Sequence, residues 1–453
     1  MSAVTVHKNQ GRESAPDLFN ILIKLAIPTV LEEVLSSLLQ YVDTAMVGRL
    51  GENATAAVSV TTTITWLIHC VPGAISVAAI SLIAQAVGSG DSEIIKRVSR
   101  QLTLLVFYSG IAIGVITVAL SPYIPMWMGA DVSIRKQASV YFAIICAPMI
   151  FRCGSRIFGA AIRATKDTKT PMIINMGANV LNIILNYVFI YMMGLGVNGA
   201  AYSTAISFSL GGIVMYIFYR NNKTLNAKGF TLKPDVEVLK KVSKVAVPVM
   251  CTNFTSCAGY VVFASLVTGM GNTIFAAHSI AVTAETIFYI PGYGLRTATS
   301  TLIGISIGEN NQHKFDLVSK LSIIVTVIGM CISGAILYVV SYPLMCFFTS
   351  SARVAEIGAE MLRLVSFSEP FFGLMIVTEG IYYGMGKTKY PFIIETFCMW
   401  GIRILFTFIV VRVWNLGLRE VWYCMIADNV GKAVLLAVTL LSKNMRSIEG
   451  AKL

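Results

Sequence analysis

The sequence predicts an all-α integral membrane protein whose twelve transmembrane helices form two six-helix bundles. Three observations support this prediction. Hydrophobic residues occupy 56% of the 453 positions and charged residues only 13%, and the mean hydropathy is +0.73. Apolar runs of about 20 or more residues recur along the chain, each long enough to cross a membrane as a helix. A repeat at a fixed offset divides these runs into two sets. The composition excludes an ordinary soluble domain.

The apolar runs place the twelve spans, with ends that are expected to be accurate only to within several residues. The spans are expected at 18–47, 54–87, 97–120, 132–163, 170–193, 199–219, 240–268, 273–307, 316–341, 354–384, 390–413 and 419–441. Residues 1–17 are polar, and no short apolar segment with a small-residue cleavage site follows them, so we expect no removable signal peptide.

The formal charge of +12 reflects membrane topology rather than a nucleic-acid partner. If the N-terminus lies in the cytoplasm, the alternating spans place 22 lysines and arginines in cytoplasmic segments and 6 in outside segments. This is the positive-inside bias. It predicts a multi-pass protein of the cell (inner or plasma) membrane with both termini in the cytoplasm, in contact with anionic lipid.

A repeat with an offset of 220 residues organises the chain. The residues that recur at this offset include Pro28 and Pro248, Gly51 and Gly271, Gly88 and Gly308, and Pro171 and Pro391. Six spans return the chain to its starting side, so the two copies have the same orientation, as in transporters with parallel repeats. Two such bundles face one another across a cleft whose opening can alternate between the two sides. The repeat therefore predicts transport.

The repeat also predicts the domain organisation, and we expect the chain to act as a monomer. The expected parts are a cytoplasmic tail at 1–17, an N-lobe at 18–220 with spans one to six, a cytoplasmic linker at 221–241, a C-lobe at 242–443 with spans seven to twelve, and a cytoplasmic tail at 444–453.

Asp43 is the first candidate functional residue, because it closes an apolar run of more than twenty residues. A charged side chain within the hydrocarbon costs about 2.5–3.5 kcal/mol on insertion scales, so its presence is a functional hypothesis by default. Glu32 lies eleven residues earlier, about 20° away around the helix, with Ser36 on nearly the same side. The neighbouring Gln40 and Tyr41 are assigned to the wall of the substrate cleft.

The fifth span carries a stripe of four asparagines, Asn175, Asn179, Asn182 and Asn186. At 100° per residue they fall within an arc of about 60°. One or two amides could serve as interhelical hydrogen bonds, but four in register favour the lining of a polar cavity. We assign Asn175 and Asn179 to the substrate cleft.

The second copy of the repeat serves as an internal control for these polar residues. At the offset of 220, the counterparts of Asp43, Asn179, Asn182 and Asn186 are Phe263, Met399, Ile402 and Phe406, all apolar. The fold therefore does not require the polar stripe, and the asymmetry places the ion chemistry in the first half.

The second half has charged residues of its own. Asp428 and Lys432 stand four residues apart and are expected to form an intrahelical ion pair. Arg403 could neutralise either Glu395 or Glu369. Glu285 and Glu379 have no evident local partner, so either could face the cleft and attract cationic substrates; the roles of all four glutamates stay open.

Pro28 is a candidate hinge in the first span, because a proline inside a helix removes a backbone hydrogen bond and kinks the helix. Packing geometry alone is the competing explanation.

The nine cysteines and four histidines show no metal-ligand spacing and no CxxC pair, so we expect no disulfide framework, no zinc site and no cofactor. An enzyme is disfavoured because no catalytic constellation of His, Ser or Cys is visible. A channel is disfavoured because no filter-like carbonyl loop is visible.

The chain resembles the multidrug and toxic compound extrusion (MATE) family of cation-coupled antiporters over essentially its whole length. The resemblance rests on the segment VDTAMVGRLG at 42–51 after a proline-containing helix, NIILN at 182–186, GLGVNGAA at 194–201, AAH at 276–278 leading to Pro291, and the segment 380–391. It implies two six-helix lobes around a V-shaped cleft, and export of amphipathic, often cationic, compounds in exchange for H⁺ or Na⁺.

The resemblance also assigns roles to single residues. Asp43 matches the family's aspartate of the first span, Asn182 its asparagine of the fifth span, and Thr204 a threonine of the sixth span near the ion site. Some prokaryotic members have an aspartate where this chain has Asn186. The acidic pair that other bacterial members carry in the second lobe is replaced here by Ser256 and Phe372.

The expected function is antiport driven by protons, with Asp43 as the coupling acid and Glu32 as a possible helper. Sodium remains an alternative, since Asp43 with amide and hydroxyl oxygens could bind a hard cation; no other metal is expected. A lipid-linked precursor flippase of the same superfamily is the alternative function. Flippases of this kind usually have additional spans and a more cationic cleft, which the sequence does not indicate.

Overall fold

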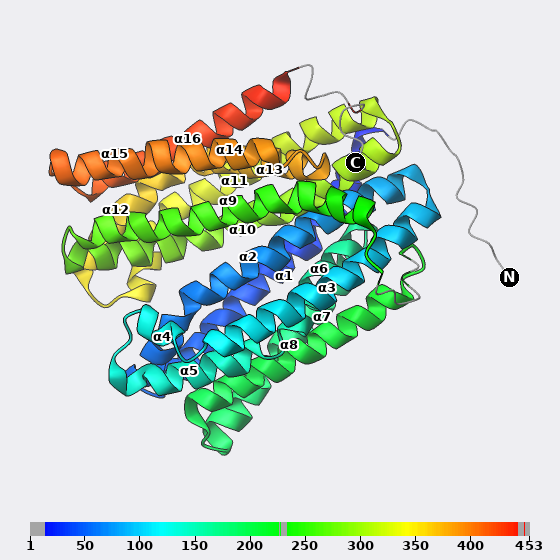
Figure 1. The fold of residues 1–453 in the computed structure, drawn as a ribbon. Coiled ribbons are helices and arrows are strands. Elements are labelled where there is room, and N and C mark those ends of the chain that lie inside the picture. Colours follow the sequence, from blue (N-terminus) through cyan, green and yellow to red (C-terminus); the bar gives the residue numbers. More distant parts are fainter. Residues whose placement is uncertain (1–13, 226, 228–232, 443–447, 449–453) are drawn as a thin grey trace.

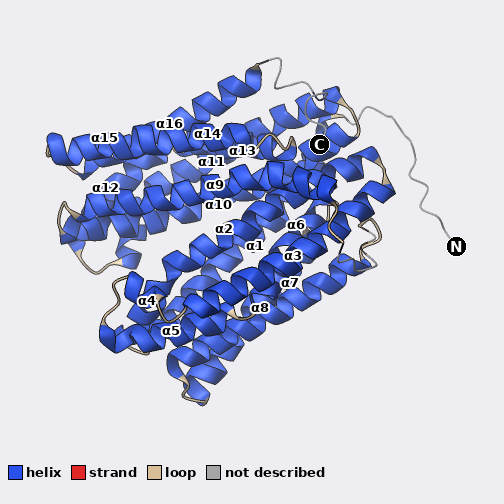
Figure 2. Ribbon diagram, viewed as in Figure 1, coloured by secondary structure: helices blue, strands red, loops and turns tan. Residues whose placement is uncertain are grey.

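The computed structural model describes residues 14–225, 227, 233–442 and 448 of the chain. Within these residues the protein consists of helices joined by short loops, without strands (Figure 2). The terminal tails expected at 1–17 and 444–453 lie almost wholly outside the described residues, as does part of the expected linker at 221–241.

The first bundle contains the helices of the first copy of the repeat. They are α1 (Ala15–Gly48), α2 (Glu52–Ser89), α3 (Ser92–Leu120), the short α4 (Ile124–Trp127), α5 (Val132–Cys146), α6 (Met149–Ala164), α7 (Lys169–Asn186) with its π-helical continuation η1 (Tyr187–Met192), and α8 (Gly196–Asn221).

The second bundle contains the helices of the second copy. They are α9 (Val236–Thr268), α10 (Asn272–Gly308), α11 (Gln312–Phe348), α12 (Ala352–Ser366), α13 (Glu369–Gly384), α14 (Lys389–Phe397) continued by η2 (Cys398–Ile404), α15 (Leu405–Phe408) and η3 (Ile409–Val413), and α16 (Leu418–Leu441).

Each of the twelve predicted spans coincides with one helix or one run of consecutive helices. Nine helices of the described chain are long and apolar enough to cross a membrane. Two bent pairs, α5 with α6 and α12 with α13, turn by 47° and 57° and together pass the same test. The one remaining span is the first, α1, which is 34 residues long but carries Lys24, Glu32, Glu33 and Asp43.

The repeated glycines before α2 and α10 have a local physical reason. Gly51 and Gly271 precede the two helices with φ angles of +104° and +109°. Side chains other than glycine rarely adopt this backbone conformation. The offset of 220 therefore preserves the same tight turn in both copies.

The described chain begins and ends on one side of the molecule, which we call the termini end; the opposite side is the far end (Figure 1). The bundles contact each other mainly where α2 packs against α9 and α10 and where α1 packs against α10. In Figure 1 the ribbons of the two bundles lie closest at the termini end and diverge toward the far end.

The contact at the termini end is unusually close because glycines bring the backbones together. A Cβ atom on Gly308 of α10 would lie 2.0 Å from the Gln85 carbonyl oxygen of α2, and one on Gly88 would lie 2.2 Å from the Ile305 carbonyl oxygen. Gln85 Nε2 and Ser81 Oγ also donate hydrogen bonds to the Gly384 carbonyl, at 3.1 and 3.4 Å.

Burial along α2 increases toward the termini end. The residues from Ala78 to Ala86, in the half toward the termini end, are buried except for Ile80, whereas Trp66 in the other half is 61% exposed. The two bundles are therefore packed together at the termini end.

Substituting Gly308 with alanine tests this packing. The added methyl group meets backbone atoms that cannot rotate away, so Gly308→Ala should destabilise the packed state by about 1–3 kcal/mol. Gly329 of α11 has nothing within 4 Å of an added Cβ, so Gly329→Ala should be neutral or stabilising by up to about 1 kcal/mol. Thermal unfolding of the purified variants measures both. Equal melting temperatures for the two variants would contradict the close backbone contact.

Candidate functional site

A polar seam joins α1 to α7, with three contacts along its length. Glu32 Oε1 accepts a hydrogen bond from Asn175 Nδ2 at 2.6 Å, and Ser36 Oγ accepts one from Asn179 Nδ2 at 3.2 Å. The third contact joins Asp43 to Asn186. In each of the three pairs the two residues are 143 positions apart in the sequence. The polar face of α1 therefore lies in register with the asparagine stripe of α7.

Asp43 lies in a connected network near the far end of α1. Asn186 Nδ2 donates to Asp43 Oδ1 and also contacts Asn182 Oδ1 at 3.3 Å. Asn182 Nδ2 in turn donates to Thr204 Oγ1 at 3.2 Å. The residues assigned to ion coupling from the sequence therefore form one network, with Glu32 as the exception.

The network includes Ser203 of α8, which the sequence did not single out. Ser203 Oγ donates to Asn186 Oδ1 and thereby orients the Asn186 amide. Because the amide oxygen already accepts this bond, the NH₂ group is the part that faces Asp43. In the sequence, the one indication that Ser203 belongs to this network was its neighbour Thr204, which the family resemblance assigns to the ion site.

Asp43 is half-buried and forms no ion pair with the described residues. Asn186 is fully buried and Asn182 nearly so. A carboxyl group in such surroundings, held by a neutral amide without a cation, can gain or lose a proton without first breaking an ion pair. That is the chemistry required of a coupling acid.

Glu32 occupies a different setting from Asp43. Arg163 Nη2 of α6 donates to both Glu32 oxygens, at 2.6 and 2.7 Å. The charge of Glu32 is therefore compensated by an arginine. Glu32 and Asp43 are eleven residues apart, which corresponds to about 16 Å along the helix. The structure thus separates the expected helper from the network around Asp43.

The remaining candidates on α1 are Tyr41, Gln40 and Pro28. The Tyr41 ring lies 6.2 Å from the ring of Phe348 of α11, centroid to centroid, while Gln40 is exposed. Pro28 is buried inside the continuous α1. Two residues later, Val30 packs against Gly294 of α10, where a Cβ would lie 2.4 Å from Val30 Cγ2. Bending α1 near Pro28 would disturb this contact.

Glu285 and Glu379 do have local partners, so the expectation that they lack them is wrong. Glu285 accepts a hydrogen bond from Tyr289, one helical turn later on α10. Glu379 accepts from Tyr383, again one turn later, and forms an ion pair of 2.9 Å with Arg296 of α10. Both carboxylates are buried, and these partners leave less of their charge available to a cationic substrate.

Arg403 pairs with Asp428 rather than with Glu395 or Glu369, which corrects the second expectation for this half. Arg403 Nε lies 2.8 Å and Lys432 Nζ 2.9 Å from the same Asp428 oxygen. The predicted pair of Asp428 and Lys432 is confirmed, but as part of a cluster of three charges. Both carboxyl oxygens of Glu369, and Oε1 of Glu395, are buried without a hydrogen-bond partner among the described residues.

Several charges of α1, α6 and α10 were missed by the sequence reasoning. They are Glu33 of α1, Arg152, Arg156 and Arg163 of α6, and Arg296 of α10. The spacing of the three α6 arginines was visible in the sequence, since at 100° per residue they fall within an arc of about 40°.

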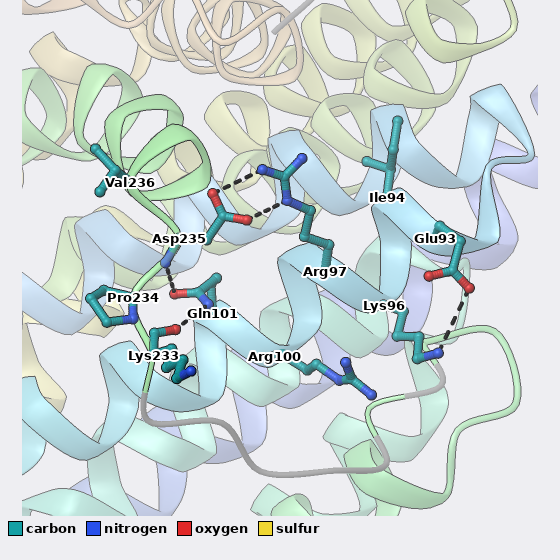
Figure 3. A pocket seen from close by; sticks show the side chains of 10 residues that line it. All are labelled: Glu93, Ile94, Lys96, Arg97, Arg100, Gln101, Lys233, Pro234, Asp235 and Val236. Carbon is teal, nitrogen blue, oxygen red and sulfur yellow. Dashed lines mark hydrogen bonds and ion pairs between the residues drawn. The ribbon is translucent and has the colours of Figure 1, made fainter.

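A second polar feature lies at the termini end, at the opposite side of the molecule from Asp43. A surface hollow of about 650 Å³ is lined by α3 and the start of α9 (Figure 3). Arg97 binds Asp235 and, at 2.9 Å, Glu237, while Gln101 bonds the backbone of Lys233 and Asp235. The Arg97 guanidinium lowers the pKa of Asp235 from its usual range. The residues that line the hollow thus form a polar contact between the two bundles.

The described residues contain no group of three His, Cys, Asp or Glu side chains that could hold a metal ion.

Removing the charge of Asp428 tests whether the cluster of three charges is structural. Asp428→Asn leaves Arg403 and Lys432 buried without their shared counter-charge, which should cost about 3–5 kcal/mol. The exposed Glu356 makes only a 4.0 Å surface contact with Arg353, so Glu356→Gln should change stability by less than about 0.5 kcal/mol. Thermal unfolding compares the two variants, and equal effects would contradict a structural role for the cluster.

Comparisons with known proteins agree with this architecture. The family model MatE matches the chain twice, at residues 28–188 and 248–409, so the two matches begin 220 residues apart. The chain is 28% identical over 436 residues to "Probable multidrug resistance protein NorM" of Thermotoga maritima, covering 95% of this chain and 94% of the relative. It is 26% identical over 439 residues to "Probable multidrug resistance protein YoeA" of Bacillus subtilis, covering 95% and 93%.

Solved structures show the same fold. A MATE in the straight conformation superposes with a TM-score of 0.87 at 22% identity, covering 96% of this chain and 97% of the other. An outward-facing multidrug resistance MATE family transporter of the MOP superfamily gives 0.86 at 23% identity, covering 96% of both chains. With both halves matched by the family model and twelve spans in two bundles, this chain belongs to the MATE family of membrane transporters.

Proposed function

We propose that this protein is a proton-coupled antiporter that exports amphipathic organic compounds by alternating access. The observation that carries the proposal is the network of Asp43, Asn186, Asn182, Ser203 and Thr204, a carboxyl group with neutral partners inside the first bundle. The relatives named as multidrug resistance proteins support small organic substrates.

The orientation of Asn186 favours protons over sodium. Sodium prefers oxygen ligands, but the Asn186 oxygen accepts the Ser203 hydroxyl, so the NH₂ group points at Asp43. A cation at Asp43 would require this amide to turn and give up the Ser203 bond. A proton on Asp43 requires no such change.

Protonation would weaken the joint between α1 and α7. A hydrogen bond to a charged acceptor is roughly twice as strong as one between neutral groups, so neutral Asp43 holds Asn186 less firmly. The far half of α1 is then freer to move relative to α7, with Pro28 as the point of bending. Deprotonation restores the charge and the contact.

The proposed orientation follows from the distribution of basic residues. The positive-inside bias supports a cytoplasmic position of the termini end, in a protein that crosses the plasma membrane. The tight packing of α2 and α10 then closes the cytoplasmic side, which fits a state that exchanges protons and substrate with the outside.

A lipid-linked precursor flippase is the alternative, and one observation favours it. Arg152 and Arg156 add positive charge to the first bundle, whereas the sequence analysis expected no strongly cationic cleft. Export of a water-soluble dye by purified protein in liposomes separates the two functions, because a dedicated flippase would not move it.

Neutralising Asp43 tests the coupling mechanism. Asp43→Asn should reduce proton-driven export of a dye from liposomes by at least about tenfold, since the charge-assisted bond that senses the proton is worth about 1.5–3 kcal/mol. Asp43→Glu should retain part of the activity, and Glu356→Gln, which alters an exposed carboxylate, should retain all of it. Dye flux is measured under an imposed pH gradient and, separately, an imposed Na⁺ gradient. Full export by Asp43→Asn would refute the mechanism. Export driven by the Na⁺ gradient alone would show that sodium, and not the proton, is the coupling ion.

A further inference from the structure

The α6 helix carries three arginines on one face, and only one of them is paired. Arg163 binds Glu32. Arg152 and Arg156 have neither an ion pair nor a hydrogen bond within residues 14–225, 227, 233–442 and 448. The other arginines of the helical interior provide a comparison, since Arg296 binds Glu379 and Arg403 binds Asp428.

Arg152 lies beside the network that contains Asp43. Its guanidinium carbon is 5.0 Å from the centre of the Phe208 ring of α8, and Phe208 stands one helical turn after Thr204, on the same face. Tyr141 of α5 lies within electrostatic range of both Asp43 and Arg152. Arg152 Nη1 is buried and has no acceptor within the described residues.

Arg156 lies close to α2 and yet remains accessible. Its Nη1 is 3.9 Å from the position of a Cβ on Gly73, and the residue is exposed. Glu33 of α1 interacts with it electrostatically but is not within the 4.0 Å of an ion pair among the described contacts. Glu33 is exposed as well, so the two opposite charges are accessible and do not neutralise each other by contact.

A charge inside a membrane protein is costly and is usually paired, so an arginine without a partner marks a binding or transport role. Guanidinium groups are suited to planar carboxylate, sulfonate or phosphate groups, because they present several donors in a fixed geometry. We propose that Arg152 and Arg156 bind an anionic group of the transported substrate. This assignment rests on the proposed transport function and adds a substrate class to it: amphipathic organic anions and zwitterions.

Glu33 gives the site a second specificity element. A zwitterion could place its anionic group on the α6 arginines and its cationic group toward Glu33. A purely cationic amphipath would meet two uncompensated positive charges here and gain only Glu33 in return. The site therefore discriminates between dyes of the same ring system by charge.

Two dyes with the same xanthene core test the site. Sulforhodamine B carries sulfonates and a net negative charge, whereas rhodamine 6G is a cation. Binding of each dye to the purified full-length protein in nanodiscs is measured by fluorescence anisotropy. The double variant Arg152→Gln/Arg156→Gln should lower the affinity for sulforhodamine B, relative to rhodamine 6G, by at least about tenfold. The double lysine variant should recover part of the difference, because it keeps the charge.

Arg363→Gln is the matched control, since the Arg363 side chain of α12 donates to the Ser341 hydroxyl of its own bundle. This substitution should leave the ratio of the two affinities unchanged. A purely structural role for the α6 arginines predicts that the glutamine variant loses both dyes equally and melts at a lower temperature. That result, or an unchanged affinity for sulforhodamine B, would overturn the proposal.

The binding measurement is independent of coupling. If the wild-type protein in liposomes shows no flux under either ion gradient but the charge-dependent loss of binding is found, the antiport proposal fails and the anion site stands. If gradient-driven export is found and the two dyes respond alike to the substitutions, the antiport stands and the anion site fails.

Discussion

Compensation of charge within the membrane is the constraint on which this structure depends most. An ionised side chain in the helical interior is stabilised by an opposite charge or by a set of hydrogen bonds, because the hydrocarbon offers neither. Arg163 with Glu32, Arg296 with Glu379 and Arg403 with Asp428 satisfy this condition through contacts between helices, and Lys432 satisfies it by pairing with Asp428 within α16. These pairs hold α1 to α6, α10 to α13 and η2 to α16. The groups that remain outside such pairs, Asp43 above all, are the ones available for function.

The two copies of the repeat use one backbone plan for different chemistry. The position of Asp43 is occupied in the second copy by Phe263, which is buried and contacts the ring of His278 at 5.5 Å. The Arg403 guanidinium lies 5.7 Å from the same phenyl ring, so even this apolar site adjoins a charge, one that is firmly paired with Asp428. At this position the first bundle thus keeps a carboxyl group with neutral partners, whereas the second has an apolar ring beside a paired arginine. This difference supports the assignment of ion coupling to the first bundle.

The arrangement of the bundles relates the site to motion. Glycines in α2 and α10 bring the helices into backbone contact at the termini end, and such contacts resist small deformations because no flexible side chain intervenes. The seam between α1 and α7 is held by side-chain hydrogen bonds, whose strength changes with the charge of Asp43. A structure that is rigid at one end and adjustable along one seam fits a transporter in which protonation alters the position of one helix.

The features that could be predicted from the sequence alone are those that repeat at a regular spacing along the chain. The apolar runs gave all twelve spans, the offset of 220 gave two copies with the same turn glycines, and the spacing of 100° per residue gave the asparagine stripe, because each of these features is local to one helix or repeats along the chain. Even the pair of Asp428 and Lys432 was predictable, since its members are four residues apart.

Only the tertiary structure decided which charges on different helices are paired. Arg163 and Glu32 are 131 residues apart in sequence. Arg403 had three possible carboxylates, one on its own span and two on other helices. The choice among them depends on how helices are rotated and how deep each side chain lies, which no periodicity encodes. For the same reason the arginines of α6 were visible as a stripe, but their lack of partners, and with it their proposed role, came from the packing of α1, α2 and α8 around them.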